Sequence, residues 1–404
     1  MRILFVSWDG PGTDYMTGLF LPIYNRLQLE EGHEFHVLQF TWDTPERTHK
    51  VAETARAMQI RYRAVEAWRR PVYPATAATI ANGVREVARY AREHQIDVLM
   101  PRSVIPATMC LAARPFLPGT RMVYDADGLA EEERVGVGRM RHGGWQFKLV
   151  RAVGERAVRA SAAVVTRTEW AREDLAHRAG VSPERLFVVT NGRDPSVYTP
   201  GTPERRAALR AEYGIGDDAP LLIYVGSMGG NYRPDLVSGF ARYALRQQPD
   251  LHVIALTPQS DVLRDAVGED TYSGRLHITT VGLDEVAAHV AAADLGLGFL
   301  ADRRATRARS LVKVGEYLLC GTPVAATVAV TEGSGPLAGA GVGTVLDDTA
   351  AGLTDEYDRI LSWVLEDVIP NREHYRDACR RAGVERFTLA KSAEQYAAAL
   401  RYAS

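Results

Sequence analysis

Short apolar runs alternate with longer amphipathic helical patterns along the whole chain, in two successive series. The runs are continuous rather than alternating, which is typical of strands buried on both faces. Buried strands joined by helical crossovers form parallel sheets covered by helices. The runs of the first series are residues 3–8, 35–40, 98–100, 122–124, 162–166 and 186–190. Those of the second are residues 221–225, 253–256, 278–281, 295–300, 323–327 and 343–346.

Helical patterns separate these runs, for example residues 19–31, 78–94, 145–160, 233–246, 285–293 and 311–320. Two such series predict an α/β protein with two Rossmann-like, doubly wound parallel-sheet domains that face each other across a cleft. A stretch rich in proline and glycine, residues 192–203, breaks both helix and strand and is the predicted linker. We expect one domain over 1–195, a second over 196–384, and a C-terminal helix over 385–404 that crosses back to the first.

Composition excludes several classes of protein. Hydrophobic residues make up 46% of 404, which excludes a wholly disordered chain, and the net charge of −2 gives no global attraction to nucleic acid. The three cysteines have no metal-ligand spacing and suit a reducing cytoplasm. The opening apolar run is too short for a signal peptide, and no run of 18 apolar residues could span a membrane. We therefore expect a cytoplasmic protein without a nucleic-acid partner.

The segment from Ser310 to Val324 predicts a helix with an anion site at its start. Ser310 is a suitable N-cap and Gly321 a suitable residue just beyond the C-terminus. Amides of a first helical turn lack partners and carry the positive end of the dipole, which suits a diphosphate. Lys313 can neutralise phosphate, and Glu316, on the same face, can accept hydrogen bonds from ribose hydroxyls. Four arginines precede this segment in residues 302–309. The alternative is a capped surface helix beside a solvated charge run.

Three further segments follow predicted strands. Gly226, Gly229 and Gly230 allow a close approach of backbone to ligand, with Arg233 opening the next helix; the alternative is a plain tight turn. A glycine-rich turn follows the first strand and predicts an acceptor-side loop. Its site residues are Gly10, Gly12, Thr13 and Asp14.

The third segment contains two alternating aspartates, Asp125 and Asp127, at another strand end. They could align an acceptor hydroxyl. The alternative, given at least equal weight, is that Asp127 caps the next helix and that acids favour its first turn.

Residues 139–159 mix basic and aromatic side chains, including Trp145, Phe147 and Lys148. Such a helix could lie on an acidic membrane surface. We favour the more ordinary interpretation, in which one face packs against the protein and the other is solvated. Peripheral contact with the inner face of the membrane stays open as an alternative.

Five motifs in order resemble the large retaining glycosyltransferase family that includes glycogen-synthase-like and bacterial mannosyl- and glucosyltransferases, a glycosyltransferase family 4-like pattern with the GT-B fold. The motif Gly-Thr-Pro-Val at 321–324, preceded by Glu316, resembles the family's E-A-x-A-C-G-T-P-V signature. The others are residues 31–34, resembling G-H-E-V; 188–200, resembling V-I-P-N-G-V-D-x-x-x-F-x-P; 225–227, resembling a V-G strand; and 292–296, resembling A-A-D-V-x-V.

The resemblance implies transfer of a sugar from a UDP- or GDP-sugar to a hydroxyl acceptor (a glycan, a lipid-linked glycan or a small molecule), with retention and without metal or cofactor. The candidate catalytic residues are Asp127, Arg233 and Lys313, of which Asp127 is proposed from its place at a strand end. Donor-binding residues carried over by position are Gly226, Ser227, Arg233, Thr257, Val281, Arg309, Ser310, Leu311, Val312, Lys313 and Glu316. Among them, the amides from Arg309 to Val312 would hold the distal phosphate, and the base would lie near Thr257 and Val281.

The chain departs from the family pattern at three positions. Ala308 stands where the family has its earlier glutamate, Asp127 where a histidine is usual, and Ser227 where an arginine often follows the first glycine. A subgroup with the pattern S-x-P-x-K-x-x-E-Y-L fits better, although Val312 replaces its proline. Two alternatives therefore remain: a GT-B epimerase acting on the nucleotide sugar, and a non-catalytic subunit that binds it.

Overall fold

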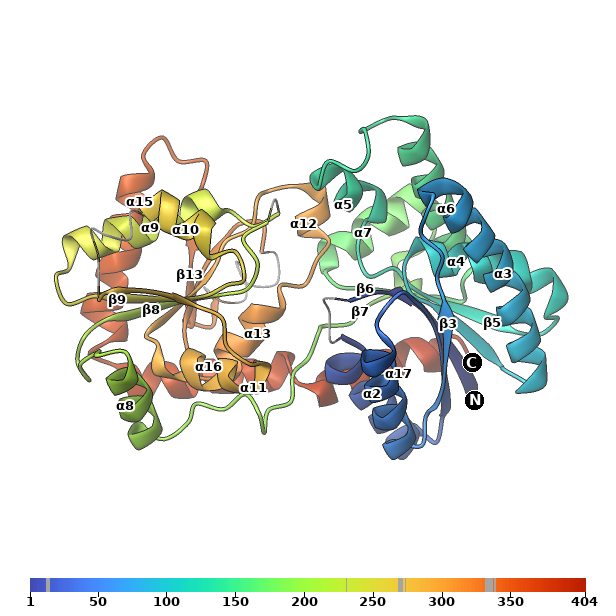
Figure 1. Ribbon diagram of the computed structural model, residues 1–404, viewed down its shortest axis with the longest axis horizontal. Coiled ribbons are helices and arrows are strands. Elements are labelled where there is room, and N and C mark those ends of the chain that lie inside the picture. Colours follow the sequence, from blue (N-terminus) through green and yellow to red (C-terminus); the bar gives the residue numbers. More distant parts are fainter. Residues whose placement is uncertain (12–14, 230, 268–271, 273, 331–336, 338) are drawn as a thin grey trace. The chain divides into compact units, whose positions relative to one another are not determined.

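The chain forms two compact units, each built around one parallel sheet. The computed structural model describes residues 1–11, 15–229, 231–267, 272, 274–330, 337 and 339–404. Unit 1 contains Met1–Thr190 and Leu389–Ser404, and unit 2 contains Asn191–Thr388 (Figure 1). The chain thus leaves unit 1 within the motif at 188–200 and returns to it after Thr388.

Unit 1 has a seven-stranded sheet in the order β3-β2-β1-β4-β5-β6-β7, with every pairing parallel. The strands are β1 (Arg2–Asp9), β2 (Glu34–Thr41), β3 (Arg61–Glu66), β4 (Val98–Pro101), β5 (Arg121–Asp125), β6 (Ala163–Thr166) and β7 (Leu186–Val188). The main helices are α1 (Leu21–Glu31), α2 (Pro45–Ala57), α3 (Val72–Glu93), α4 (Val104–Ala113), α5 (Ala130–Gly136), α6 (Trp145–Ala160), α7 (Glu169–Ala179) and α17 (Leu389–Tyr402). A π-helical turn, η1 (Met16–Phe20), precedes α1.

Unit 2 has a six-stranded parallel sheet in the order β10-β9-β8-β11-β12-β13. The strands are β8 (Leu221–Val225), β9 (His252–Leu256), β10 (Leu276–Thr279), β11 (Leu295–Gly298), β12 (Val324–Thr327) and β13 (Gly343–Leu346). The helices are α8 (Pro203–Glu212), α9 (Pro234–Gln247), α10 (Ser260–Val267), α11 (Leu283–Ala292), α12 (Arg304–Arg307), α13 (Val312–Leu319), α15 (Leu353–Trp363) and α16 (Arg372–Arg386), with a π-helical turn η5 (Val364–Val368) between the last two.

The predicted fold class is confirmed, and every predicted strand is present. The sequence analysis missed β3, the edge strand of unit 1. Its pattern Arg-Tyr-Arg-Ala-Val-Glu is mostly polar, and its residues are exposed or half-buried. A search for continuous apolar runs cannot detect such a strand, because only one edge of it pairs with a neighbour and its faces are incompletely covered.

Each sheet changes its winding direction at its centre, which fixes where the loops gather. In unit 1 the change lies between β1 and β4, and in unit 2 between β8 and β11. Doubly wound sheets bind ligands at the carboxyl ends of the strands beside this point. We therefore expect ligand-binding residues in the loops after β1, β4, β8 and β11.

Helix α17 packs on unit 1, against α1, β6 and β7. Its Tyr396 donates a hydrogen bond of 2.6 Å to Asp125 at the end of β5. Arg167 donates to both carboxylate oxygens of the same Asp125, at 2.7 Å each, and all three side chains are buried. A buried charge is stable only when it is paired in this way. This cluster secures the C-terminal helix to the first sheet.

Candidate functional site

The unit 2 site lies beside the winding change between β8 and β11. The turn after β8 begins at Gly226, whose φ of +117° is unfavourable for a residue with a side chain. A Cβ at this position would lie 3.3 Å from Nζ of Lys313. An antiparallel bridge between Tyr232 and Leu300 joins this turn to the loop after β11. The backbone of the glycine turn therefore lies directly against the lysine of α13.

The ammonium group of Lys313 is buried without a hydrogen-bond partner. Its Nζ lies 4.1 Å from the centre of the Tyr224 ring and 4.8 Å from that of Tyr232. Aromatic faces attract a cation but do not replace the hydrogen bonds that an ammonium group makes in water. Burial lowers the pKa of Lys313 to about 7, and the nearby Glu316 opposes that shift. This lysine therefore needs an anion if it is to stay charged.

The helix α13 starts later than the sequence predicted. Its N-cap residue is Leu311, which makes no side-chain cap, so the prediction that Ser310 caps the helix was wrong. The Ser310 hydroxyl is instead buried without a partner. Ser310 therefore lies one residue before the N-cap position. Gly321 does follow the helix with a left-handed φ of +79°, as predicted.

Backbone amides at the start of α13 form the rest of this candidate site. The amide of Arg309 donates to the Thr306 carbonyl at 3.1 Å, so it is occupied by the turn of α12. Among the described residues the structure gives no partner to the amides of Ser310, Leu311 and Val312. These amides, the Ser310 hydroxyl and the Lys313 ammonium group come from one short stretch of chain. Such a set of unpaired donors is suited to a multiply charged anion.

Glu316 is held by a residue from the start of unit 2. Arg193 Nε donates to Glu316 Oε1 at 2.8 Å, and both side chains are largely buried. Arg193 belongs to the motif at 188–200, which the sequence analysis quoted without giving this residue a role. Burial, followed by the charge of Glu316, raises the pKa of Tyr198. The carboxylate predicted to receive a ribose is thus positioned by Arg193.

Arg233 is engaged by two acids. Its guanidinium pairs with Asp235, with Nε at 2.9 Å from Oδ1, and its Nη1 donates to Asp348. Hydrogen bonds to Asp235 raise the pKa of Arg233, and the charge of Asp348 adds to this effect. Contact with a diphosphate would require Arg233 to exchange one of these partners.

The remaining predicted donor residues lie in adjoining loops. Thr257 directly follows β9, is buried, and its hydroxyl accepts from the Gln259 amide at 3.2 Å. Val281 lies just beyond the end of β10 and is half-buried. The Ser227 carbonyl accepts from the Tyr224 hydroxyl at 2.5 Å. These contacts place the three residues at the carboxyl edge of the unit 2 sheet.

Unit 1 has a charged cluster at its own winding change. Arg102, after β4, pairs with Asp127 at 2.7 Å, and Asp127 lies 3.6 Å from Nε of Arg167. Burial opposes the charge of Arg102, but Asp127, Asp125 and Asp9 together raise its pKa. Burial also raises the pKa of Asp9, against the effect of Arg102.

Asp127 does not cap α5, because the N-cap there is Leu129. Its φ of +61° turns it away from the helix start and towards Arg102. Arg102 was missed in the sequence because a lone arginine after a four-residue strand has no motif; its place after the central strand was the available signal. Gly10 lies after β1 against the Trp42 ring, where a side chain would clash. Gly12, Thr13 and Asp14 lie outside the described residues.

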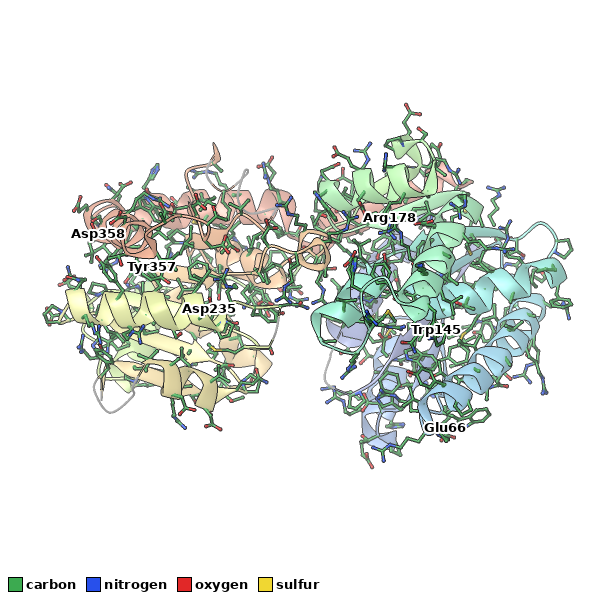
Figure 2. All side chains as sticks on the ribbon, turned by 90° about the horizontal axis from the view of Figure 1, so that it is seen from above. Glu66, Trp145, Arg178, Asp235, Tyr357 and Asp358 are labelled. Atoms are coloured by element: carbon green, nitrogen blue, oxygen red, sulfur yellow. The ribbon has the colours of Figure 1, made fainter. Side chains whose placement is uncertain are left out.

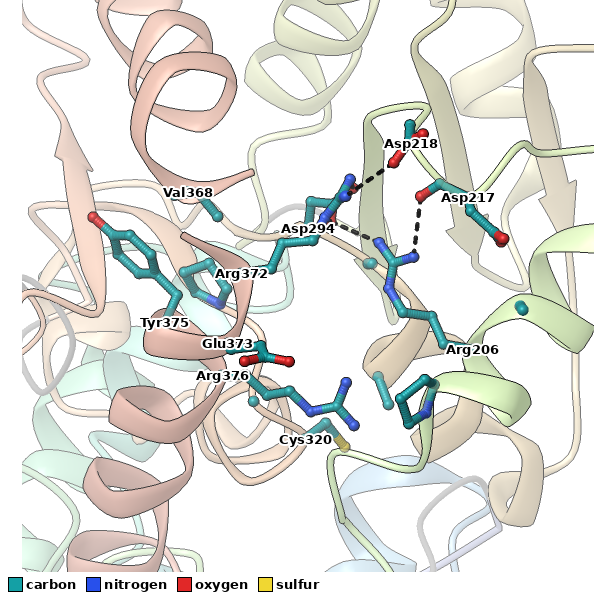
Figure 3. A pocket seen from close by; sticks show the side chains of 16 residues that line it. Arg206, Asp217, Asp218, Asp294, Cys320, Val368, Arg372, Glu373, Tyr375 and Arg376 are labelled. Atoms are coloured by element: carbon teal, nitrogen blue, oxygen red, sulfur yellow. Dashed lines mark hydrogen bonds and ion pairs between the residues drawn. The ribbon is translucent and has the colours of Figure 1, made fainter. Parts of the chain in front are cut away.

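A separate pocket of about 320 Å³ lies at the opposite, amino edge of the unit 2 sheet (Figure 3). Asp294, which immediately precedes β11, accepts from Arg206 Nη2 and Arg372 Nε, each at 2.8 Å. None of the predicted site residues lines this pocket. The buried acid Asp294 is therefore paired with arginines. Among the described residues, no cluster of three or more potential ligands for a metal ion is found.

Comparison with known proteins gives matches in both sequence and fold. Residues 26–197 match the family model described as Glycosyltransferase Family 4. A D-inositol 3-phosphate glycosyltransferase from Kineococcus radiotolerans is 30% identical over 218 residues, 49% of this chain and 48% of the relative. One of the same name from Kribbella flavida is 31% identical over 225 residues, half of each chain. The chain thus matches about half the length of these curated relatives.

Solved structures match over nearly the whole chain. HepE from Anabaena in complex with UDP has a TM-score of 0.69 and 17% identity, covering 99% of this chain and 100% of its own. WaaG, a glycosyltransferase involved in lipopolysaccharide biosynthesis, has a TM-score of 0.68 and 18% identity, covering 98% and 99%. At these identities the likeness concerns the fold, which is that of GT-B glycosyltransferases.

Proposed function

We propose that this chain, which is similar to Glycosyltransferase Family 4 and has the GT-B fold, transfers a sugar from a UDP- or GDP-sugar to a hydroxyl acceptor. One observation carries the proposal: the buried Lys313 ammonium group has no hydrogen-bond partner and lies beside the unpaired amides at the start of α13. A nucleoside diphosphate supplies the missing negative charge. HepE, one of the similar structures, was solved with UDP-glucose, which favours a donor of this class.

In this proposal, different residues bind different parts of the nucleotide-sugar donor. Lys313 and the amides of Ser310, Leu311 and Val312 receive the diphosphate. Glu316, oriented by Arg193, receives the ribose hydroxyls. Thr257 and Val281 lie where the base would bind, and Arg233 would add charge after leaving Asp235 or Asp348.

In the proposed reaction the bond between the sugar's anomeric carbon and the distal phosphate oxygen breaks. The anomeric carbon forms a bond to the acceptor oxygen on the same face, and the departing phosphate takes the acceptor's proton. This course retains the anomeric configuration. Lys313 stabilises the charge that develops on the leaving phosphate, in place of a metal ion. Asp127 would align the acceptor hydroxyl, and Arg102 fixes the position of its carboxylate.

A non-catalytic subunit that binds the nucleotide sugar is the second candidate. Its support is that Arg233 and Asp127 are both already ion-paired, and that Ala308 stands where the family has a glutamate. An epimerase is the third possibility among GT-B proteins. We further propose a cytoplasmic location, supported by three buried cysteines without disulfides. No helix among the described residues is long and apolar enough to cross a bilayer.

The test is a thermal-shift series with UDP, GDP, ADP, dTDP and CMP on the wild type and on Lys313→Met. We expect one diphosphate to raise the melting temperature in proportion to ln(1 + [L]/Kd), and this shift to be lost in the variant. Lys391→Met is the matched control, because Lys391 is half-buried, pairs with Glu394 and belongs to unit 1 rather than to unit 2. The matching UDP- or GDP-sugars are then assayed for hydrolysis and for transfer.

The results of these assays distinguish the three candidate functions. Transfer or slow hydrolysis of the donor supports the transferase. Binding without any turnover supports the non-catalytic subunit, and a change in the sugar without release of nucleotide supports the epimerase. If no nucleotide shifts the melting temperature, the proposed diphosphate site is wrong.

A further inference from the structure

Two segments of unit 1 combine exposed hydrophobic side chains with exposed positive charge. They are residues 67–75, between β3 and the start of α3, and residues 134–154, which run from the end of α5 into α6. We call them together the basic–aromatic surface. Trp145 from the second segment is labelled in Figure 2, as is Glu66, which precedes the first.

Large hydrophobic side chains are concentrated here. The described residues contain fourteen large hydrophobic side chains that are exposed, and six of them lie in these segments, which make up less than a tenth of the chain. The six are Trp68, Val72, Tyr73, Val137, Trp145 and Leu149. Trp145 is 71% exposed and Tyr73 68%. Single exposed hydrophobics need no explanation, but a gathering of this kind marks an interaction surface.

Positively charged side chains are also concentrated in these two segments. The whole chain has 48 Lys and Arg against 50 Asp and Glu, yet these two segments contain no acid. Their basic residues are Arg69, Arg70, Arg134, Arg139, Arg141, Lys148 and Arg151. Five of these, all but Arg134 and Arg151, are exposed. Acids flank the segments at Glu66, Glu133 and Glu155, and Arg151 pairs with Glu155, but the five exposed cations give the surface a positive charge although the protein as a whole is nearly neutral.

The two segments form one surface at one edge of the sheet. Gln146 at the start of α6 donates to the Tyr73 hydroxyl at the start of α3, at 2.8 Å. Helices α3 and α6 both begin where the chain has left the carboxyl ends of β3 and β5. This is the edge at which Asp127 and Arg102 lie. The surface thus adjoins the proposed acceptor side of unit 1.

We propose that the basic–aromatic surface binds the interface of an anionic lipid bilayer. Tryptophan and tyrosine partition into the headgroup region because each has an apolar ring and a polar group. Arginine and lysine attract anionic lipid, each contributing about fivefold in affinity near the surface. A soluble acidic partner would use the charge but would not explain Trp145, Leu149 and Val72 exposed among the cations.

Binding of the bilayer does not depend on the proposed reaction. One consequence does rest on the proposed function. If the chain is a transferase and the bilayer lies at the carboxyl edge of unit 1, the acceptor would be attached to a lipid. The binding experiment below uses no donor, so its failure and the failure of the transferase proposal are distinguishable.

The test is sedimentation of the full chain with vesicles of phosphatidylcholine alone and with added phosphatidylglycerol. We expect binding to vesicles with phosphatidylglycerol and little to phosphatidylcholine. The double variant Arg70→Ser/Lys148→Ser should lower the partition coefficient at least tenfold, and Trp145→Ser/Leu149→Ser should lower it even at high salt, where charge is screened. All four side chains are exposed, so we expect the variants to fold, as circular dichroism will check.

The matched control is Leu29→Ser/Arg56→Ser, which removes one exposed hydrophobic and one exposed arginine from α1 and α2. It should bind as the wild type does. The proposal is overturned if vesicles with phosphatidylglycerol do not bind, or if the control loses as much affinity as the surface variants. Binding of single-stranded RNA by the same surface, without vesicle binding, would also overturn it.

Discussion

The ammonium nitrogen of Lys313 lies 4.1 Å from the centre of the Tyr224 ring, on a helix whose first amides are unpaired. Burial lowers the pKa of this lysine to about 7, so it is about half protonated at neutral pH. A bound anion favours its charged form and raises the pKa again. The protonation of Lys313 therefore reports whether a diphosphate occupies the site.

Diphosphate binding should take up close to one proton at pH 8. Free Lys313 is mostly neutral there, whereas a diphosphate ligand, with a phosphate pKa of about 6, is already ionised. Affinity should fall by about tenfold for each pH unit above 7, until the pKa of the bound state is reached. Calorimetry at pH 8 in buffers of different ionisation enthalpy measures the uptake. Equal uptake by Lys313→Met would show that another group titrates.

Lys313→Met should stabilise the unliganded protein at pH 6, by up to a few kcal/mol. The folded lysine has a pKa near 7, below the unfolded value near 10.5, so the folded state binds fewer protons. The wild type therefore gains stability as pH rises from about 7 to 10.5, and the advantage of the variant shrinks. Urea unfolding at pH 6 and pH 9 measures the difference. A difference that does not change with pH would contradict the buried charge.

Loss of either partner in the Arg193–Glu316 pair should destabilise unit 2 by about 1–3 kcal/mol, because the remaining charged side chain loses this ion pair while it stays largely buried. A double variant, Arg193→Met/Glu316→Gln, should lose less than the sum of the single variants. Donor affinity separates the two roles. Glu316→Ala should weaken it, by a few kcal/mol at most, and more than Arg193→Met does. Unchanged donor affinity in Glu316→Ala would contradict the ribose assignment.

Arg233→Ala should lower kcat by about 10²-fold or more if the arginine reaches the phosphates during the reaction. The variant also frees Asp235 and Asp348 from their partner. Arg242→Ala, from the exposed side of the same helix, is the control. Wild-type kinetics in Arg233→Ala would mean that the arginine only neutralises the two acids.

Asp125→Asn should destabilise unit 1 by about 3–5 kcal/mol, because Arg167 would lose its fully buried counter-ion and keep only the partly exposed Asp127, 3.6 Å away. Tyr396→Phe should cost less, about 1–3 kcal/mol, because it removes the hydrogen bonds to Asp125 and from Arg167 but leaves their ion pair in place. Denaturant unfolding of both variants tests this order. Asp127→Asn, whose side chain is 34% exposed, should be milder than Asp125→Asn. The reverse order would show that Asp125 is not the centre of the cluster.

The fold was predictable because its signal is local. A strand that is buried on both faces must be apolar along its length. Each such strand therefore appears in the sequence as a continuous apolar run, for example β1 and β8. The edge strand β3 was missed because partial burial leaves no such run. The turn at Gly226 and the end of helix α13 before Gly321 were also predictable from the sequence, since both need backbone conformations that favour glycine.

The pairing of the site residues was decided by the tertiary structure. Sequence spacing placed Lys313 and Glu316 on one helix, but could not show that the lysine is enclosed by Tyr224 and Tyr232 or that Arg193 holds the glutamate. Nor could it show that Arg102 meets Asp127. These partners come from different loops that only the winding of the sheets brings together. The sequence by itself determined which strands and turns form, because backbone preference and burial are encoded locally. Only the tertiary structure decided which charged side chains lie beside one another, because that depends on distances between residues far apart in the chain.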